Sequence, residues 1–479
     1  MAKDYSKYFT PSIKDARKRK STETPILDYN DYFNIKGFGK GKLYKVETFG
    51  CQGNEADSEK IKGILEALEF TEADGLEDAD IILLNTCAIR ENAENRVFGE
   101  LGRLKKYKRN NPELILGVCG CMPQEEQVTE RILKKVRHVD LVFGTHNIYK
   151  LPEYLETVVL SKERVIEVFS EEGKIVENMP KIRDNSKKAW VNIMYGCDEF
   201  CTYCIVPYTR GKERSRKKTH IINEVQELIN QGYKEITLLG QNVNSYGRDF
   251  TDEDYTFSNL LSDLNQMKID RIRFTTSHPK DFDLETVKVL AKGGNLMPYI
   301  HLPVQSGSNE VLKRMNRKYT KETYLELVEN IYKYIPNASL TTDIIVGFPG
   351  ETEEQFNETL DLVEKCRFEG AYTFVFSARE GTPAASYEDE TSIEVKKERL
   401  YKLNKLVNDG YQVGTNRFEN KTVKVLVDGV SKKGDDVLAG YTENNKLVNF
   451  KGTTDLIGEI VEVHITKAFT WHMLGELIE

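Results

Sequence analysis

The sequence contains no apolar run that is long enough to cross a membrane, and its 479 residues include only eight cysteines. A spanning helix needs about 18 or more consecutive apolar residues, so we expect no membrane segment. The first residues lack the apolar centre of a signal peptide, which predicts a cytoplasmic protein. Eight cysteines are too few for a disulfide framework in so long a chain, and a reducing compartment leaves thiols free to bind metal.

The sequence also lacks a net positive charge. Its formal charge is −8, whereas proteins that bind nucleic acid usually carry a basic excess. Local patches matter more than the sum, and Arg210–Lys218 is such a patch, with six positive residues and one negative. We interpret this run as either a solvated face or a surface for an anionic substrate or a cofactor carboxylate.

Three of the cysteines, Cys197, Cys201 and Cys204, are close together in one short stretch. A structural zinc site has four ligands, commonly as two Cys-x-x-Cys pairs, and no second pair follows here. Three thiolates suit a [4Fe–4S] cluster instead, and they would leave its fourth iron open. Catalytic metal sites keep such an open position. We therefore predict a catalytic iron–sulfur cluster, with zinc binding or plain packing as the alternative.

Residues 43–160 alternate between apolar strands and amphipathic helices, which predicts an α/β domain with a doubly wound parallel sheet. Residues 1–42 are polar and basic, with the run Lys18–Lys20, and they predict a partly ordered extension, for which we favour a solvated tail over an RNA contact. The strands predicted within the domain are Leu43–Phe49, Asp80–Asn85, Leu114–Val118 and Asp140–Phe143.

Cys51, Cys87 and Cys121 each follow one of the first three of these strands. Ligands of open α/β sheets bind at the carboxyl ends of the strands, so the three thiols should meet at one edge of the sheet. We predict a second three-cysteine cluster there. Cys119 is a rival for the third ligand, but Cys121 is nearer the strand end, and we expect Cys119 and Cys366 to be packing residues.

The rest of the chain divides into three further segments. Residues 161–188 contain Pro180 and little periodicity, and they predict a linker or a short hairpin. Residues 189–414 contain six strand–helix units, which match a partial (βα)6 barrel. Residues 415–479 predict a small antiparallel β-barrel that either binds RNA or caps its neighbour. The barrel strands are predicted at Trp190–Tyr195, Glu235–Leu239, Arg271–Thr275, Tyr299–Pro303, Leu340–Val346 and Tyr372–Phe376.

Polar residues occur at the carboxyl ends of the predicted barrel strands, where barrel enzymes place their chemistry. Such side chains suit a nucleoside cofactor, although polar loops occur without any cofactor. Asp343 lies within a strand, where an inward carboxylate needs a partner. His278 would act as an acid or base or would shape the turn before Pro279. The cofactor-binding candidates are Gln241, Asn242, Ser277, Gln305 and Asp343.

The spacing of Cys197, Cys201 and Cys204, with Tyr203 in the aromatic position before the last cysteine, resembles the signature of the radical S-adenosylmethionine (SAM) superfamily. This resemblance implies that SAM binds the open iron and is cleaved to a deoxyadenosyl radical. Together with the predicted N-terminal cluster and terminal barrel, the chain is similar to the methylthiotransferases from about residue 43 to residue 479. Gly440–Asn445 resembles a turn of their C-terminal TRAM domain.

Tyr195–Gly211 and Thr275–Pro279 resemble the branch that acts on isopentenylated adenosine beside the tRNA anticodon. This resemblance implies two [4Fe–4S] clusters, two SAM molecules and a methylthio group transferred to adenine carbon 2. It also implies a tRNA anticodon stem–loop and an electron donor such as flavodoxin or ferredoxin as partners, and we expect a monomer. Alternatives are another tRNA adenosine derivative, a ribosomal protein side chain, or a non-catalytic zinc-bearing RNA-binding module.

Overall fold

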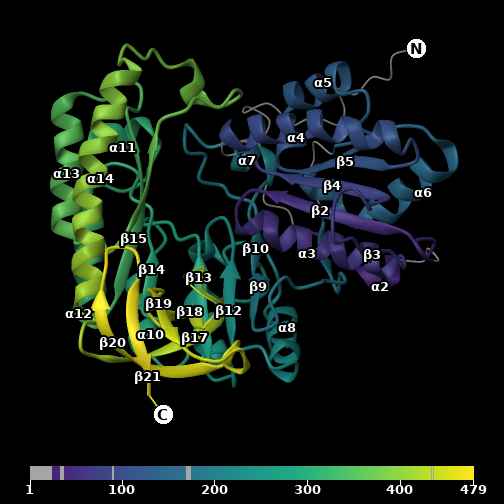
Figure 1. Ribbon diagram of the computed structural model, residues 1–479. Helices are drawn as coiled ribbons and strands as arrows, with labels where there is room; N and C mark the ends of the chain where they lie inside the picture. The colour runs from purple at the N-terminus through teal and green to yellow at the C-terminus, as the bar shows by residue number, and fades with distance from the viewer. Residues whose placement is uncertain are drawn as a thin grey trace.

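The computed structural model describes residues 24–32, 37–88, 91–168, 174–432, 434 and 436–478. It contains the three predicted parts: a doubly wound sheet domain, a partial barrel beside it and a small closed barrel at the foot of the molecule (Figure 1). None of the helices in this described part of the chain combines the length and the apolar character that a membrane crossing requires.

The N-terminal domain is a six-stranded parallel sheet in the order β3-β2-β4-β5-β6-β7. Helices α3 (Gln52–Ala67) and α6 (Leu151–Ser161) cover one face, and α4 (Glu91–Asn110) and α5 (Glu126–Lys135) cover the other. The central strands are buried throughout because both faces are covered. The strands are β2 (Leu43–Phe49), β3 (Thr71–Glu72), β4 (Ile81–Thr86), β5 (Ile115–Gly120), β6 (Leu141–Phe143) and β7 (Val165–Glu167).

The segment predicted as a linker or hairpin is more structured than expected. Its first strand, β7, extends the sheet of the N-terminal domain, and its second, β8 (Ile175–Glu177), pairs in parallel with β1 (Ile26–Asp28). The Ile182 backbone N–H donates to the Glu59 carbonyl of α3 at 2.9 Å. β7 and β8 do not pair with each other, so the segment forms no hairpin, and strands of three residues are too short to show a periodicity in the sequence.

Part of the predicted extension also belongs to the N-terminal domain. Strand β1 and the short helix α2 (Tyr29–Tyr32) lie within residues 1–42, and Tyr29 is buried in the core beneath α3 and α6. Because β1 pairs with β8, this part is not a solvated tail. The sequence did not reveal the pairing, since β8 lies about 150 residues further along the chain and local patterns do not extend that far. The basic run Lys18–Lys20 lies outside the described residues.

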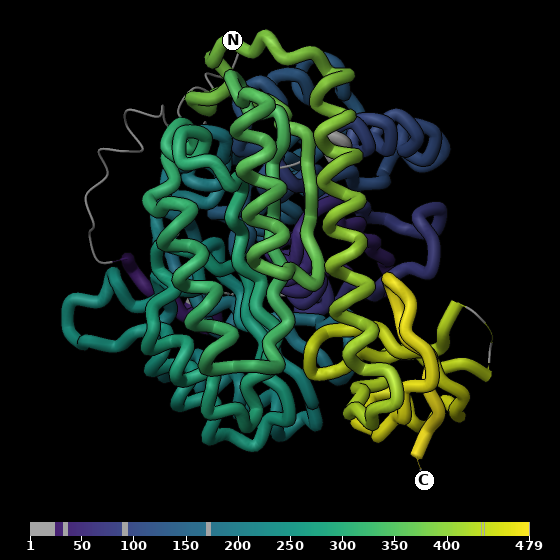
Figure 2. The backbone as a smooth tube through the Cα atoms, turned by 90° about the vertical axis from the view of Figure 1, so that its left-hand side faces the viewer, coloured from purple at the N-terminus to yellow at the C-terminus, as the bar shows by residue number. Residues whose placement is uncertain are grey.

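The partial barrel consists of two three-stranded parallel sheets, β9-β12-β13 and β14-β15-β16. Leu296, just before β14, bridges to Ile272 and joins the two sheets. Helices pack on the outside, and Figure 2 shows α13 and α14 side by side. The strands are β9 (Lys188–Asn192), β12 (Glu235–Leu239), β13 (Arg271–Thr275), β14 (Tyr299–His301), β15 (Ser339–Val346) and β16 (Ala371–Val375). The helices are α8 (Lys218–Asn230), α9 (Phe257–Leu264), α10 (Leu284–Ala291), α11 (Asn309–Arg314), α12 (Lys321–Tyr334), α13 (Glu353–Cys366) and α14 (Ile393–Asn416).

The terminal domain is a closed barrel in the order β17-β18-β19-β21-β20. The predicted small barrel is confirmed: four of its five pairings are antiparallel, and one, between β19 and β21, is parallel. The sequence also gave no clear signal for the short β21. The strands are β17 (Thr422–Val430), β18 (Val437–Thr442), β19 (Leu447–Lys451), β20 (Ile460–Ala468) and β21 (Met473–Leu477).

The turn between β18 and β19 fixes the terminal domain to the amino ends of the barrel strands. The Arg273 guanidinium donates to the carbonyls of Thr442 at 2.8 Å and Glu443 at 2.9 Å. Asn444 donates to the Asn337 carbonyl, just before β15, at 2.8 Å. The terminal domain therefore closes the end of the barrel that is opposite to the carboxyl ends of the strands.

Candidate iron–sulfur and cofactor sites

The loop with Cys197, Cys201 and Cys204 lies between two short paired strands, β10 (Met194–Tyr195) and β11 (Arg214–Ser215). Gly196 starts this loop with a φ of 79°, and a Cβ there would lie 1.9 Å from the Lys212 carbonyl oxygen, so only glycine fits. The Cys197 backbone N–H donates to the Gly211 carbonyl at 3.0 Å. These contacts hold the loop at the carboxyl end of β9.

The chemistry of the three thiols fits a cluster of positive iron ions. Burial, Glu213 and the neighbouring Cys201 and Cys204 raise the pKa of Cys197 well above its ordinary value. Burial and Cys201 raise the pKa of Cys204 to about 12. Like charges on neighbouring sulfurs repel one another, so a set of three thiolates on one loop requires a cation between them. An iron–sulfur cluster supplies that cation, because it binds cysteines as thiolates.

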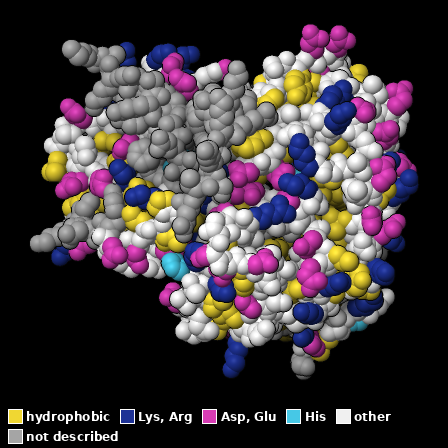
Figure 3. Space-filling view, turned by 180° about the vertical axis from the view of Figure 1, so that it is seen from behind, with side chains coloured by type: hydrophobic (Ala, Val, Ile, Leu, Met, Phe, Trp, Pro, Cys, Tyr) yellow, Lys and Arg dark blue, Asp and Glu magenta, His cyan; other side chains and the backbone are white. Residues whose placement is uncertain are grey.

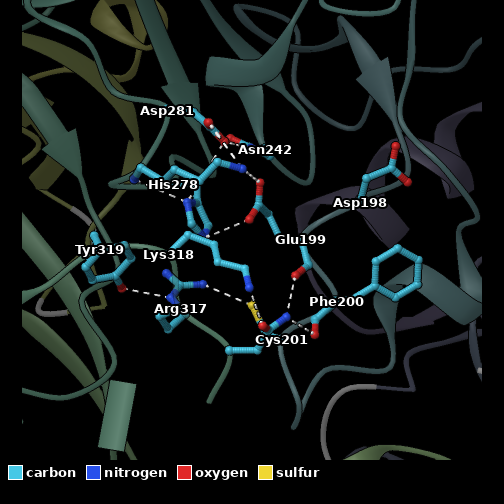
Figure 4. A network of polar contacts seen from close by, with 12 residues as sticks. Asp198, Glu199, Phe200, Cys201, Asn242, His278, Asp281, Arg317, Lys318 and Tyr319 are labelled. Atoms are coloured by element: carbon cyan, nitrogen blue, oxygen red, sulfur yellow. Dashed lines mark hydrogen bonds and ion pairs between the residues drawn. The ribbon is translucent and has the colours of Figure 1, made fainter. Parts of the chain in front are cut away.

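Arg317 is a further residue of this site that sequence reasoning missed. Its Nη1 donates to the Cys201 Sγ at 3.3 Å (Figure 4). Two more hydrogen bonds, to the Tyr319 hydroxyl at 2.8 Å and the Pro303 carbonyl at 3.0 Å, fix the guanidinium. A hydrogen bond to a cluster sulfur is one of the factors that set a cluster's reduction potential. No local pattern marks Arg317, because Cys201 lies more than a hundred residues earlier in the chain.

Cys51, Cys87 and Cys121 follow three adjacent strands, β2, β4 and β5. A hydrogen bond from Cys87 lowers the pKa of Cys51 to about 5 against the opposing effect of burial. Cys121 packs against Ala88, directly after Cys87. Cys119 instead lies in the hydrophobic core under α3 and α6, where burial raises the pKa of its thiol well above the ordinary value. Cys366 lies in the core of the partial barrel.

The segment directly after Cys204 connects the two sets of cysteines. Ile205 and Tyr208, of which the latter belongs to helix α7 (Val206–Thr209), pack against Cys121. Arg210 ends this helix, and its Nη2 is 2.9 Å from Asp57 Oδ2 on α3. Arg210 also forms a side-chain hydrogen bond with Cys121. The two three-cysteine sets therefore lie on either side of residues 205–210.

The basic run Arg210–Lys218 is neither a solvated face nor an open anion surface. Its three arginines are buried, and its last two lysines pair with Asp252 and Glu253. Arg216 lies 2.5 Å from Glu177 of β8 and 2.7 Å from Glu224 of α8. Burial alone would raise the pKa of Glu224, but Lys181, Arg216 and Arg183 outweigh it and hold this pKa well below its ordinary value.

Replacing Arg216 with alanine is expected to destabilise the protein strongly. The variant leaves two buried carboxylates, Glu177 and Glu224, without the guanidinium that neutralises them. Removing one partner of a buried ion pair costs about 3–5 kcal/mol. The urea midpoint of the transition that unfolds the barrel, followed by circular dichroism, should fall accordingly.

Lys217→Ala is the matched control because the pair of Lys217 with Asp252 is exposed to solvent. Exposed ion pairs contribute little, so this neighbouring variant should unfold at the wild-type midpoint. Equal midpoints for the Arg216 and Lys217 variants would show that the buried network does not stabilise the fold.

A group of buried polar atoms lies beside the cysteine loop at the carboxyl ends of β12 and β13. Asn242 donates to Asp281 Oδ2 at 2.7 Å (Figure 4). Lys280 donates to Glu199 Oε1 at 2.6 Å. Burial, with Arg317 and Lys280, holds the pKa of His278 far below its ordinary value, so its imidazole is neutral. Within the described residues, the buried atoms that lack a hydrogen-bond partner include Asn242 Oδ1, Asn244 Nδ2, Ser277 Oγ and His278 Nε2.

These unpartnered atoms fit a polar cofactor, because buried polar groups normally have a hydrogen-bond partner. The loops that carry Asn242 and Ser277 lie against each other, as the sequence predicts for strand-end residues: the Val243 backbone N–H donates to the Thr276 carbonyl at 3.0 Å. Gln241 has a different contact, since its Oε1 accepts a hydrogen bond from the Gly196 backbone at 2.6 Å. It therefore supports the cysteine loop.

The other candidates lie on the second sheet of the barrel. The Gln305 backbone N–H donates to the Asp343 carbonyl at 2.8 Å. The Asp343 carboxylate has the partner that its position requires, because His301 Nε2 is 3.4 Å from Asp343 Oδ1. Tyr203 packs edge-on against Phe348, with 6.5 Å between ring centroids.

Three family descriptions match successive parts of the chain. "Uncharacterized protein family UPF0004" matches residues 43–144, which hold the first cysteine set. "Radical SAM superfamily" matches residues 191–363, and "TRAM domain" matches residues 416–478. The matches coincide with the sheet domain, the partial barrel and the small closed barrel of the structure.

Curated relatives match nearly the whole chain. A Bacillus subtilis (strain 168) protein is 59% identical over 99% of this chain and 95% of its own length. An Oceanobacillus iheyensis protein is 58% identical over 98% of this chain and 91% of its own length. Both are named tRNA-2-methylthio-N(6)-dimethylallyladenosine synthase.

Among solved structures, a radical S-adenosylmethionine methyltransferase, TsrM, from Kitasatospora setae has a TM-score of 0.54. It is 14% identical to this chain, and the match covers 72% of this chain and 77% of TsrM. At this identity the likeness concerns the fold alone. The identity to the curated relatives is far higher and covers almost every residue. This chain therefore belongs to the radical SAM methylthiotransferase family.

Proposed function

We propose that this protein transfers a methylthio group to carbon 2 of N6-(dimethylallyl)adenosine beside the tRNA anticodon. One observation carries this proposal: two sets of three cysteines lie on either side of residues 205–210. Each set has one ligand fewer than closed coordination of a [4Fe–4S] cluster requires. The names of the curated relatives support the choice of substrate.

In this proposal, Cys197, Cys201 and Cys204 hold one [4Fe–4S] cluster, and Cys51, Cys87 and Cys121 hold the other. When bound, the first cluster with SAM supplies hydrogen-atom abstraction, and the second with another SAM supplies the methylthio group. A one-electron donor such as flavodoxin or ferredoxin provides the electron, and the protein acts as a monomer.

The protein's own residues bind and orient these groups. Arg317 stabilises negative charge on Cys201, and Arg210 does the same beside Cys121. Asn242 and Ser277 offer their unpartnered buried atoms to SAM, and the neutral His278 accepts or donates a hydrogen bond without adding a charge. Gln241 keeps the Gly196 turn, and with it the cysteine loop, in place.

The RNA substrate must present its base outside the loop stack, because the reacting carbon lies inside the barrel in this proposal. The described part of the face in Figure 3 mixes positive and negative side chains and carries no large basic patch. Affinity for the phosphate backbone from that face should therefore be modest. Recognition of the base itself must contribute to binding.

An anaerobic assay tests the proposal. Reduced, cluster-reconstituted protein is incubated with SAM and anticodon stem–loops that carry or lack the dimethylallyl group. The proposal requires a methylthio mass gain in the dimethylallyl RNA, with one deoxyadenosine and one S-adenosylhomocysteine formed per product. Absence of that gain overturns the proposed substrate, and zinc in place of iron and sulfide in metal analysis overturns the proposed chemistry.

A further inference from the structure

The alternation of side chains along the barrel strands divides them into outward and inward residues. Ile300, Leu340 and Ile344 belong to the core between strands and helices, so the alternate positions face the inside of the barrel. The register pairs Asp343 with Tyr372 and Ile345 with Phe374. Paired residues of parallel strands lie on the same face, and Tyr372 and Phe374 therefore face inward.

Contacts of the side chains agree with this assignment. The ring of His301 lies 5.8 Å from the ring of Tyr372, and the same histidine reaches Asp343. On the opposite face of β16, Ala371 and Val375 pack against the core of the barrel. Tyr372 thus belongs to a row of inward residues on three neighbouring strands.

The two aromatic side chains are unusually accessible for this position. Tyr372 is 56% exposed and Phe374 is 38% exposed. β16 is the last strand of its sheet, and within the described residues nothing pairs with its free edge. An exposed aromatic surface inside an enzyme barrel indicates a ligand with an apolar, flat face.

The aromatic surface also continues toward the cysteine loop. Phe376 follows on the same face of the chain, and its ring lies 5.1 Å from that of Phe348. Phe348 in turn contacts Tyr203, between Cys201 and Cys204. Because the turn of Thr442 and Asn444 closes the amino end of the barrel, a ligand on this surface lies between that closed end and the cysteine loop.

We propose that Tyr372 and Phe374 form the surface on which the target adenine and its dimethylallyl group pack inside the barrel. This inference rests on the proposed function and assigns residues that select the base. Every nucleobase has a flat π-face that can stack on an aromatic side chain. The dimethylallyl group adds apolar area whose burial against the two rings favours binding. In this proposal the role of both residues is to bind the base.

A double-mutant cycle between protein and RNA tests the inference. Binding of reconstituted full-length protein to two stem–loops is measured by fluorescence anisotropy, one with dimethylallyladenosine and one with an abasic site at the target position. Stacking should make wild-type protein prefer the intact base by roughly tenfold or more. Tyr372→Ala and Phe374→Ala should each reduce this preference severalfold, and Tyr372→Phe should keep it.

Tyr401→Ala is the matched control, because Tyr401 is 74% exposed on α14, outside the barrel. It should keep the wild-type preference. The inference is overturned if both alanine variants, at 372 and at 374, keep the wild-type preference for the intact base. If the wild type still methylthiolates the RNA, that result leaves the proposed function in place. A wild-type protein that neither modifies the RNA nor distinguishes the two stem–loops overturns the proposed function together with this inference.

Discussion

Replacing Cys87 with alanine is expected to abolish methylthio product while deoxyadenosine formation from SAM continues. Cys87 follows β4 and hydrogen-bonds to Cys51, whereas the Cys197–Cys204 loop belongs to the partial barrel. Loss of one thiolate from a three-thiolate set leaves too few ligands to keep a cluster. The iron content should fall from about eight to about four per chain, and chromatography should still detect deoxyadenosine.

Cys119→Ala provides a control on the neighbouring strand. Cys119 is fully buried in the hydrophobic core, on the strand that ends just before Cys121. Its replacement removes a buried sulfur without touching the predicted ligand set, so the variant should keep its iron and its product. Wild-type amounts of methylthio product from Cys87→Ala would contradict the second cluster, and loss of iron from Cys119→Ala would reverse the choice between Cys119 and Cys121.

Residues that follow regular strands were predictable from the sequence. Strand periodicity located β2, β4 and β5, and a parallel sheet necessarily brings the residues after these strands to one edge. The same rule located Asn242 and Ser277 beside the cysteine loop. In both cases a local pattern and a general property of parallel sheets determine the position, so no knowledge of distant contacts is needed.

Residues whose role depends on distant partners were not predictable. Arg216 is part of a run whose charges suggest an exposed surface. In the structure it is buried, and Glu177 of β8 and Glu224 of α8 neutralise its charge. Arg317 reaches Cys201 across more than a hundred residues. A charged residue in a sequence does not reveal whether its side chain is buried. Burial of an ion depends on partners that come near it only when the chain folds.

Two arginines tie the sheet domain to the partial barrel. Glu59 on α3 and Glu224 on α8 both pair with Arg183, which lies between β8 and β9 in the chain. This residue therefore ties the sheet domain to the barrel. Arg210 makes a second tie through Asp57, next to the cysteines. The relative position of the two sets is thus fixed by buried ion pairs on either side of α3.

Replacing Cys201 with alanine is expected to abolish SAM cleavage and methylthio product together. Cys201 is the central cysteine of its loop and the one that Arg317 contacts, so its loss removes a ligand and leaves a buried guanidinium without its sulfur partner. Iron should again fall to about four per chain, as in Cys87→Ala, because the other cluster remains. The two variants would then share an iron content and differ in deoxyadenosine, which assigns each chemical step to one set of cysteines.

Cys366→Ala is the control for this variant, since Cys366 is equally buried in the barrel core but lies on α13, away from the loop. It should keep both activities and all of its iron, with some loss of stability from the cavity. If Cys201→Ala still formed deoxyadenosine, the loop would not hold the cluster that cleaves SAM. If Cys87→Ala lost deoxyadenosine formation at the same time, the assignment of the two sets would have to be reversed.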